Sequence, residues 1–281
     1  MRLRALIVAP PTIDYIYEEG KLASVSPGGP ALYSGLALIS RFNAKVYAVG
    51  PVGYLSMYTT IVENAVGIER LGYSHPGVGA VFELDYRGDS RRVVAKSRIP
   101  AIDIDVVAEV ASKVHPDMIL LSPIQGEESG VIHGLLYSSY SRCLGIDIQG
   151  YARGNVEVAE HVITSNYTVL HASIDDIDFR RVFNRASSGI IIYTRGIGPI
   201  TILDRRIGVE IEPDIDVVLS ESTGAGDVFT ALTLAYICMG YDTIESVRMS
   251  SKETSRLLIA IRRSVESYKP LLESSINSME I

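Results

Sequence analysis

Towards its C-terminal end the chain reads Glu221-Ser222-Thr223-Gly224-Ala225-Gly226-Asp227-Val228-Phe229, and an apolar segment then continues to Met239 and stops at Gly240. This pattern predicts a tight turn of small residues followed by a long buried helix. The first backbone N–H groups of such a helix are unpaired, and the helix dipole favours negative charge beside them. The run therefore predicts an anion site next to Asp227. On these residues alone, a turn in which Asp227 only complements the helix dipole explains the pattern equally well.

Short apolar runs recur along the rest of the chain, with helical stretches between them. They cover residues 5–9, 45–49, 118–121, 143–148, 161–164 and 189–194. Near-continuous Val, Ile and Leu runs of this length are typical of strands buried on both faces of a parallel sheet. We therefore expect a doubly wound α/β fold, in which a mainly parallel sheet is flanked by helices and residues 1–281 form a single domain.

Two segments, 15–25 and 78–95, alternate polar and apolar residues instead. A period of two is typical of half-exposed strands, and Arg87-Gly88-Asp89 suits a hairpin turn. We expect a small antiparallel sheet that stands off the main domain and serves as a lid, as a homodimer surface, or as both. A second hairpin is predicted at 199–203 and 207–211, and Asp242 has the capping-box spacing of a helix that runs to near residue 261.

Composition excludes several classes of protein. Hydrophobic residues make up 47% and charged residues 21%, an ordinary globular balance. The formal charge of −7 and the scattered Lys and Arg disfavour nucleic-acid binding. The N-terminal apolar run ends at Pro10-Pro11, too early for a signal peptide or a membrane span, so no membrane association is expected.

Cysteine and histidine usage argues against disulfides and protein metal ligands. Cys143 and Cys238 are far apart in sequence, so neither a disulfide framework nor a CxxC metal site is expected, and a reducing cytoplasm fits best. The five histidines include no i, i+4 pair, which makes a zinc site improbable. We assign most of the histidines to surface or packing positions.

The run around Asp227 is neither a Walker A loop nor a GxGxxG motif, because it lacks the Lys and has Phe229 at the third glycine position. It resembles the signature D-T-x-G-A-G-D-x-F of the ribokinase/PfkB carbohydrate-kinase family, with Glu221 in place of the first Asp. The resemblance implies an ATP-dependent kinase. In that family the amides corresponding to Gly224, Ala225 and Gly226 stabilise the transferred phosphoryl group, and Asp227 would be the catalytic base.

The same resemblance extends to the N-terminal part of the chain. Gly28 and Gly29 look like the family's Gly-Gly turn, which opens a helix and contacts the phosphate acceptor. Asp14 follows the first strand, where the family carries an Asp that binds substrate hydroxyls. Without the resemblance, the glycines would be a helix-entry turn and Asp14 a turn or cap residue. Tyr33 replaces the family's usual Asn, which argues against ordinary ribose recognition.

A middle segment points to a branch of the family. Asp147-Ile148-Gln149-Gly150-Tyr151-Ala152-Arg153 looks like the D-x-Q-G-[FY]-x-R segment of the inositol-kinase-like branch, and Leu121-Ser122-Pro123 is also similar to that branch. The resemblance implies a cyclic polyol acceptor, such as myo-inositol, whose hydroxyls or phosphate Gln149 and Arg153 would bind. An ordinary loop role for these two residues is the alternative, and Asp147 is a further candidate.

Three segments resemble the donor site of the family. Asn166 lies where the family has N-x-x-E, linked to Mg²⁺ and phosphate positioning, but Val169 replaces the Glu. We therefore assign no protein metal ligand, and the ATP phosphates and water would hold the Mg²⁺. Thr194 and Gly196 resemble the T-x-G segment beside the nucleotide, and Thr223 belongs to the main signature. A nucleoside kinase and a non-catalytic sugar or nucleotide sensor are the alternatives, whereas a dinucleotide oxidoreductase lacks its glycine fingerprint.

Overall fold

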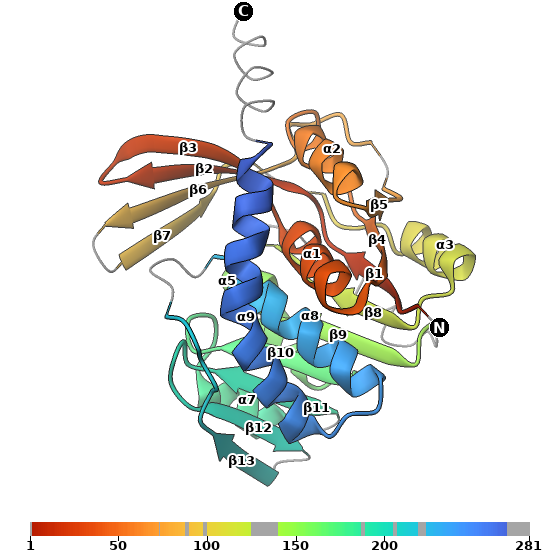
Figure 1. The fold of residues 1–281 in the computed structure, drawn as a ribbon, viewed down its shortest axis with the longest axis vertical. Helices are drawn as coiled ribbons and strands as arrows, with labels where there is room; N and C mark the ends of the chain where they lie inside the picture. Colours follow the sequence, from red (N-terminus) through yellow and green to blue (C-terminus); the bar gives the residue numbers. More distant parts are fainter. Residues whose placement is uncertain are drawn as a thin grey trace, which may run out of the picture.

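The computed structural model describes residues 2–72, 74–87, 90–97, 100–124, 140–186, 189–204, 207–218 and 223–268. These residues form a large sheet of nine strands and a small sheet of four (Figure 1). The large sheet contains β1 (Arg4–Val8), β4 (Lys45–Val49), β5 (Ile68–Arg70), β8 (Met118–Leu121), β9 (Cys143–Asp147), β10 (Val169–Ser173), β11 (Ile190–Thr194), β12 (Ile200–Asp204) and β13 (Ile207–Ile211). The small sheet contains β2 (Thr12–Glu18), β3 (Lys21–Gly28), β6 (Ala80–Arg87) and β7 (Ser90–Ala95).

The large sheet is mainly parallel, as the apolar runs predict. Its strand order is β13-β12-β11-β10-β9-β8-β1-β4-β5, and all neighbours from β11 to β5 are parallel. Only β12 and β13 pair antiparallel, at one edge. The inner strands β1, β8 and β10 are buried along almost their whole length. The carboxyl ends of the parallel strands meet at one edge of the sheet, where open α/β sheets bind ligands.

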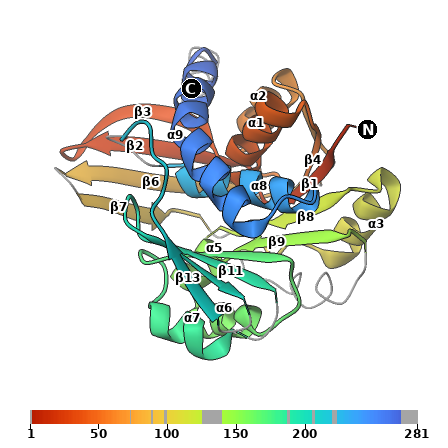
Figure 2. The ribbon, with the colours of Figure 1, turned by 60° about the horizontal axis from the view of Figure 1, so that its bottom comes forward.

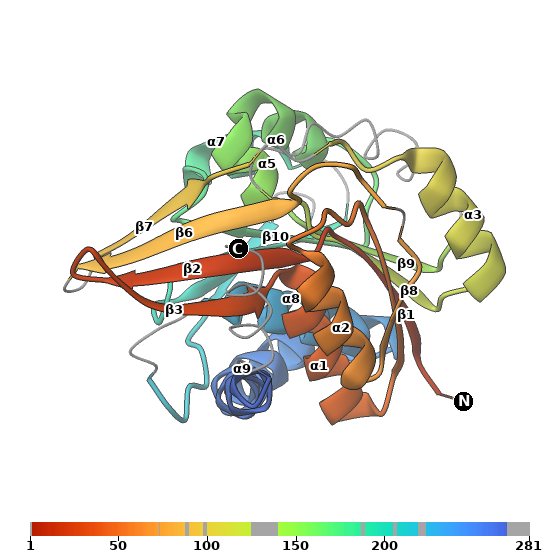
Figure 3. The same ribbon diagram turned by 90° about the horizontal axis from the view of Figure 1, so that it is seen from above.

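Helices cover both faces of this sheet, which confirms the doubly wound fold (Figure 3). One face carries α1 (Pro30–Phe42), α8 (Ala225–Cys238) and α9 (Thr243–Glu266), and the other carries α3 (Ile104–Val114), α5 (Gln149–Gly154), α6 (Val156–Ile163) and α7 (Phe179–Arg185). A further helix, α2 (Met57–Ala65), packs against β5. Among the described helices, none combines the length and apolarity that a membrane crossing requires. The cytoplasmic location stays a prediction.

One predicted strand is wrong. Residues 161–164 lie in the last turn of α6 and its C-cap, and the strand of this region is β10, which follows. The buried residues Ala159, Val162 and Ile163 have helical spacing, but a short apolar run does not distinguish a strand from a buried helix. The predicted hairpin of β12 and β13 is confirmed, although its turn residues 205–206 lie outside the described residues. Asp242 caps α9 by accepting the Ile244 and Glu245 N–H groups.

The small sheet is confirmed. Its first hairpin, β2 and β3, extends beyond the predicted residues 15–25, whereas β6 and β7 lie within the predicted residues 78–95. The order of the small sheet is β3-β2-β6-β7, and each of the two hairpins is antiparallel. The hairpins join through a parallel pairing of β2 with β6, because both strands start from the carboxyl edge of the large sheet. Figure 2 shows the small sheet standing off to one side of the large one. Residues 88–89 of the expected hairpin turn lie outside the described residues, and the pairing of two chains through this sheet stays a prediction.

The two cysteines form a disulfide, so the expectation of unpaired cysteines is wrong. Cys143 is the first residue of β9, and Cys238 is the last residue of α8. Helix α8 starts at the carboxyl edge of the sheet and runs back over it, so its last turn reaches the amino end of β9. The sequence separation of 95 residues hides this proximity.

Candidate active site

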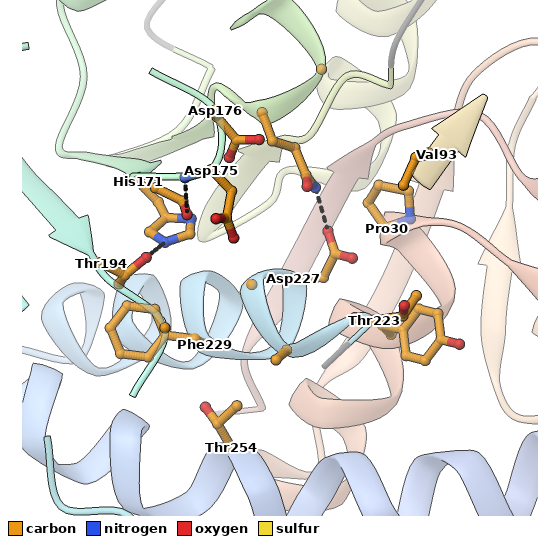
Figure 4. Close-up of a pocket in the computed structure, with 18 of the residues that line it drawn as sticks. Pro30, Val93, His171, Asp175, Asp176, Thr194, Thr223, Asp227, Phe229 and Thr254 are labelled. Atoms are coloured by element: carbon orange, nitrogen blue, oxygen red, sulfur yellow. Dashed lines mark hydrogen bonds between the residues drawn. The ribbon is translucent and has the colours of Figure 1, made fainter. Parts of the chain in front are cut away.

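A pocket of about 450 Å³ opens at the carboxyl edge of the large sheet, below the small sheet (Figure 4). This volume is in the usual range for small-molecule sites. Phe82, Leu84 and Val93 of the small sheet line it from one side. The opposite side consists of the start of α8 together with the ends of β10 and β11 and the helix α5. The pocket lies below the small sheet, and the role of this sheet as a lid stays a prediction.

The first turn of α8 forms what we call the helix wall, residues Thr223 to Asp227. Gly224 is the N-cap, with a left-handed φ of 85°, and no described side chain caps this end of the helix. A Cβ on Gly224 would lie 2.6 Å from Cδ1 of Tyr33, so only glycine fits against that ring. Because a helix cannot pair its own first N–H groups, the amides of this turn are available to an anion in the pocket.

Asp227 lies in this first turn and points into the pocket (Figure 4). Its backbone carbonyl accepts a 3.0 Å hydrogen bond from Ser34, which fixes the turn against α1. Its carboxylate accepts long hydrogen bonds from Ser122 Oγ at 3.3 Å and from Gln149 Nε2 at 3.5 Å. Burial, with a smaller contribution from the nearby charge of Asp147, raises the pKa of Asp227 to about 7. Such a carboxylate is poised to take a proton near neutral pH.

Three adjacent strands supply a buried chain of side chains on the other side. His171 Nδ1 lies 3.0 Å from Oδ2 of Asp147, and His171 Nε2 lies 3.1 Å from Oγ1 of Thr194 (Figure 4 shows the His171–Thr194 contact). The parallel register of β9 and β10 sets Asp147 beside His171. Burial favours the neutral forms, but the mutual attraction outweighs it: the pKa of Asp147 is lowered and that of His171 is raised. The assignment of most histidines to surface or packing positions missed the place of His171 in this pocket.

An ion pair completes this side. Arg153 Nε, at the end of α5, donates to Oδ1 of Asp176 at 2.7 Å, and Asp176 follows β10. Burial raises the pKa of Asp176, although Arg153 opposes the shift. Asp175 lines the pocket next to it. We call the set of residues formed by these two groups the strand wall: Asp147, Arg153, His171, Asp176 and Thr194.

The predicted acceptor residues divide into two groups. Gln149 and Arg153 line the pocket from α5, whereas Asp14, Gly28 and Gly29 lie together near the start of α1. Asp14 is buried, lines the pocket, and accepts a 2.9 Å hydrogen bond from Thr12 Oγ1. Gly28 lies behind Asp14, and a Cβ at this position would collide with the Asp14 carboxylate. Gly29 lines the pocket and opens α1 as its N-cap, with a φ of 102°. The Gly-Gly pair thus opens a helix, as predicted, and also makes room for Asp14.

The predicted donor residues divide. Thr194, Gly196 and Thr223 line the pocket, and Thr223 Oγ1 lies 2.7 Å from the hydroxyl of Tyr86 on the small sheet. The structure does not bring Asn166 to the pocket, because it is exposed and precedes β10 at the amino edge of the sheet. At the other end of the strand, Asp175 and Asp176 line the pocket, but Ser173 stands three residues before Asp176 where the N-x-x-E pattern has its Asn.

The doubly wound sheet, the small sheet over its carboxyl edge and the glycine-capped helix below it are the features of a ribokinase-like fold, which solved structures show independently. A pyrophosphate-dependent kinase of the ribokinase family, complexed with a pyrophosphate analogue and myo-inositol, has a TM-score of 0.69 at 16% identity, over 90% of this chain and 94% of that one. No protein-family model and no curated protein matches the sequence.

Two further solved structures share this fold. An uncharacterized sugar kinase from Pyrococcus horikoshii in complex with ATP has a TM-score of 0.68 at 17% identity, over 88% of this chain and 89% of that one. Adenosine kinase from Schistosoma mansoni in complex with 2-fluoroadenosine has a TM-score of 0.67 at 12% identity, over 90% of this chain and 94% of that one. At these identities the likeness establishes the fold of the chain.

Proposed function

We propose that the protein is a kinase that transfers the γ-phosphoryl group of ATP to a hydroxyl group of a sugar or cyclitol. One observation carries this proposal. A buried carboxylate with its pKa raised to about 7, that of Asp227, shares a pocket with the glycine-capped first turn of α8. Phosphoryl transfer to an alcohol needs both parts, a proton acceptor and hydrogen-bond donors for the charge of the phosphoryl group.

The chemistry follows from this arrangement. The acceptor hydroxyl loses its proton to Asp227 as its oxygen bonds to the γ-phosphorus, and the bond from that phosphorus to the bridging oxygen breaks to release ADP. The amides of Gly224, Ala225 and Gly226 donate hydrogen bonds to the phosphoryl oxygens. Because water competes with the acceptor, the small sheet above the pocket favours transfer over hydrolysis by excluding it.

The lining favours a donor that carries a base. Ile197 is 67% exposed and Val218 is 70% exposed, yet both line the pocket together with Ile215. The lining of the same pocket also includes the hydroxyl residues Ser251 and Thr254 of α9. Apolar walls with a few hydroxyls suit an adenine ring, whereas pyrophosphate alone has no apolar surface to bury there.

The pocket also fits Mg²⁺. The described residues contain no cluster of three or more ligating side chains, but Mg²⁺ commonly uses one or two carboxylates together with substrate phosphates. Asp175 and Asp176 line the pocket and supply such oxygens. When bound, the ion would neutralise part of the charge on the donor phosphates.

Polar side chains favour a polyhydroxylated acceptor. Asp14, Gln149 and Arg153 all line the pocket that contains Asp227, and they offer carboxylate, amide and guanidinium groups to ring hydroxyls. Myo-inositol, which is bound to one of the structural neighbours, is the first acceptor to test. Nucleosides are the alternative, because another neighbour is an adenosine kinase.

The test is a screen for ADP release over inositols, sugars and nucleosides, with orthophosphate release from pyrophosphate measured in parallel. We expect turnover with ATP and a cyclic polyol for the wild type, and at least a 10²-fold loss for Asp227→Asn. Asp204→Asn is the matched control, because Asp204 is exposed at the end of β12 and should leave turnover unchanged. If no acceptor gives turnover that depends on Asp227, the proposal fails, and binding without turnover would instead indicate a sensor.

A further inference from the structure

The charges around the pocket are unbalanced for a phosphate donor. The described lining residues include four carboxylates, Asp14, Asp175, Asp176 and Asp227. Among the same residues the lining has one permanent cation, Arg153, and that cation is already paired with Asp176. A polyphosphate entering this site therefore meets net negative charge unless another group supplies positive charge.

His171 is placed to supply it. The imidazole is 4% exposed and lines the pocket. A Cβ built on Gly226 would lie 3.6 Å from its Cε1 atom, so the ring lies directly against the first turn of α8. The ring of Phe229, with its centroid 5.6 Å away, packs beside it. Any charge on His171 therefore acts next to the amides that face the phosphoryl group.

The surroundings favour the imidazolium form. Asp147 is buried, and among the described residues it accepts hydrogen bonds from the Gln149 N–H at 3.0 Å and the Thr230 hydroxyl at 3.4 Å in addition to its contact with His171. Neither of these two donors is charged. His171 is the chargeable group in hydrogen-bond contact with this carboxylate, and Arg153 adds a weaker attraction without such a contact. A buried charge without a partner is costly. The carboxylates of Asp147 on β9, Asp176 after β10 and Asp227 on α8 all raise the pKa of His171.

Protonation also sets the direction of the Thr194 hydroxyl. In the imidazolium, Nδ1–H donates to Asp147 and Nε2–H donates to Thr194 Oγ1, so the Thr194 hydroxyl hydrogen points away from the ring. Its acceptor in the structure is the Ala172 carbonyl oxygen at a long 3.5 Å, which a phosphate oxygen in the pocket would replace. In the neutral ring with hydrogen on Nδ1, Nε2 accepts that hydrogen instead. Thr194 then presents only oxygen lone pairs to the pocket that it lines. The charged state attracts a phosphate, and the neutral state repels it.

We propose that His171, held as an imidazolium by Asp147, is a positioning residue for the phosphate donor: it turns the Thr194 hydroxyl towards a phosphate oxygen and adds positive charge beneath the α8 amides. This inference rests on the proposed function. The donor would be a nucleoside triphosphate or pyrophosphate. Binding of the acceptor near Asp14 and Gly29 would not depend on the hydrogen bonds that join Asp147, His171 and Thr194.

Calorimetric binding of ATP and of pyrophosphate, without acceptor, tests the inference independently of turnover. We expect His171→Gln to weaken binding of the donor about tenfold at pH 6. The ratio of variant to wild-type Kd should fall towards one as the pH rises through the raised pKa of His171. His161→Gln, an exposed histidine on α6, is the matched control and should bind as the wild type does. His171→Gln should also be compared with His171 in an Asp227→Asn background, because Asp227 itself titrates near pH 7 and would otherwise add to the pH dependence.

Two Thr194 variants keep the inference testable if His171→Gln folds poorly. Thr194→Val should weaken donor binding and abolish its dependence on His171, whereas Thr194→Ser should retain both. In active protein, Thr194→Val should raise the KM of the donor and leave the KM of the acceptor within about twofold.

The charge of His171 can be observed directly, by NMR titration of imidazole-labelled protein assigned with His171→Gln. An imidazole that is neutral at pH 6, or donor binding that is the same in His171→Gln and wild type, would overturn the inference. Absence of any ATP or pyrophosphate binding to the wild type would overturn it too. Donor binding that shows the expected pH dependence without turnover on any acceptor would leave it standing while the kinase proposal fails.

Discussion

The helix wall raises the pKa of its carboxylate, Asp227, whereas the strand wall lowers the pKa of Asp147. Asp227 receives hydrogen bonds from the neutral groups of Ser122 and Gln149, and burial raises its pKa to about 7. Asp147 is even more deeply buried, but the adjacent His171 holds its pKa below the ordinary value. Two neighbouring buried carboxylates, Asp227 in the pocket lining and Asp147 beside the lining residue His171, thus have different protonation at the same pH. The difference assigns the roles: Asp227 exchanges a proton, and Asp147 keeps a permanent charge.

The largest expected effect separates these two carboxylates. Asp227→Asn should lower turnover about 10³-fold and yet stabilise the fold at pH 8 by about 1–4 kcal/mol. The unfolded chain releases this proton near pH 4 and the folded chain near pH 7, so stability falls between those values and stays low above them. Asp147→Asn should instead destabilise the fold at pH 8, because the lowered pKa of Asp147 contributes stability above about pH 4. Urea unfolding at pH 8 measures both, and shifts in the same direction would contradict the assignment.

The two walls also differ in how far the sequence predicts them. The helix wall is a contiguous run, so its glycines, its helix start and Asp227 are predictable from local pattern. The strand wall joins Asp147, His171 and Thr194 from three strands, and only the register of a parallel sheet brings them together. Sequence suggested Asp147 and Thr194 separately, but nothing local marked His171. The disulfide was missed for the same reason, since it depends on the direction in which α8 crosses the sheet.

The next effect concerns the link between the walls. The disulfide joins β9, which carries Asp147, to α8, which carries Asp227, at the ends of both elements that lie away from the pocket. Replacing both cysteines by Ala should lower the free energy of unfolding by about 2–4 kcal/mol, because the closed loop spans 95 residues. Turnover should change less than about twofold. Thiol-specific reductant should destabilise the wild type and leave the double variant unchanged, and equal responses would refute the link.

A smaller effect tests the glycine cap of the helix wall. Gly224 and Gly240 both have left-handed backbones, with φ of 85° and 92°, but only Gly224 lies against Tyr33. Gly240→Ala should therefore cost only the backbone strain, about 1–2 kcal/mol, and leave turnover unchanged. Gly224→Ala should cost at least as much stability and also lower turnover about tenfold, because the amides shift. Equal turnover in the two variants would show that the cap does not position the amides.

The smallest effect concerns the contact of the small sheet with the helix wall. Tyr86 on β6 shares a 2.7 Å hydrogen bond with Thr223. Tyr86→Phe should cost about 0.5–1.5 kcal/mol and lower turnover a few-fold, without changing the pH dependence of donor binding. Tyr17→Phe on the neighbouring strand β2 is the control. Tyr17 pairs with Asp85, the residue before Tyr86, so its side chain lies on the other face of the sheet. Equal effects of the two variants would exclude a specific role for the contact.

The pH dependence of kcat/KM tests most directly whether Asp227 is the base beside the amides. For the wild type we predict that kcat/KM rises about tenfold per pH unit on the acid side and levels off near pH 7, where the raised pKa of Asp227 lies. The residual activity of Asp227→Asn should lack this rise. A wild-type kcat/KM that stays constant from about pH 5 to 9, or a rise that survives in Asp227→Asn, would contradict the account.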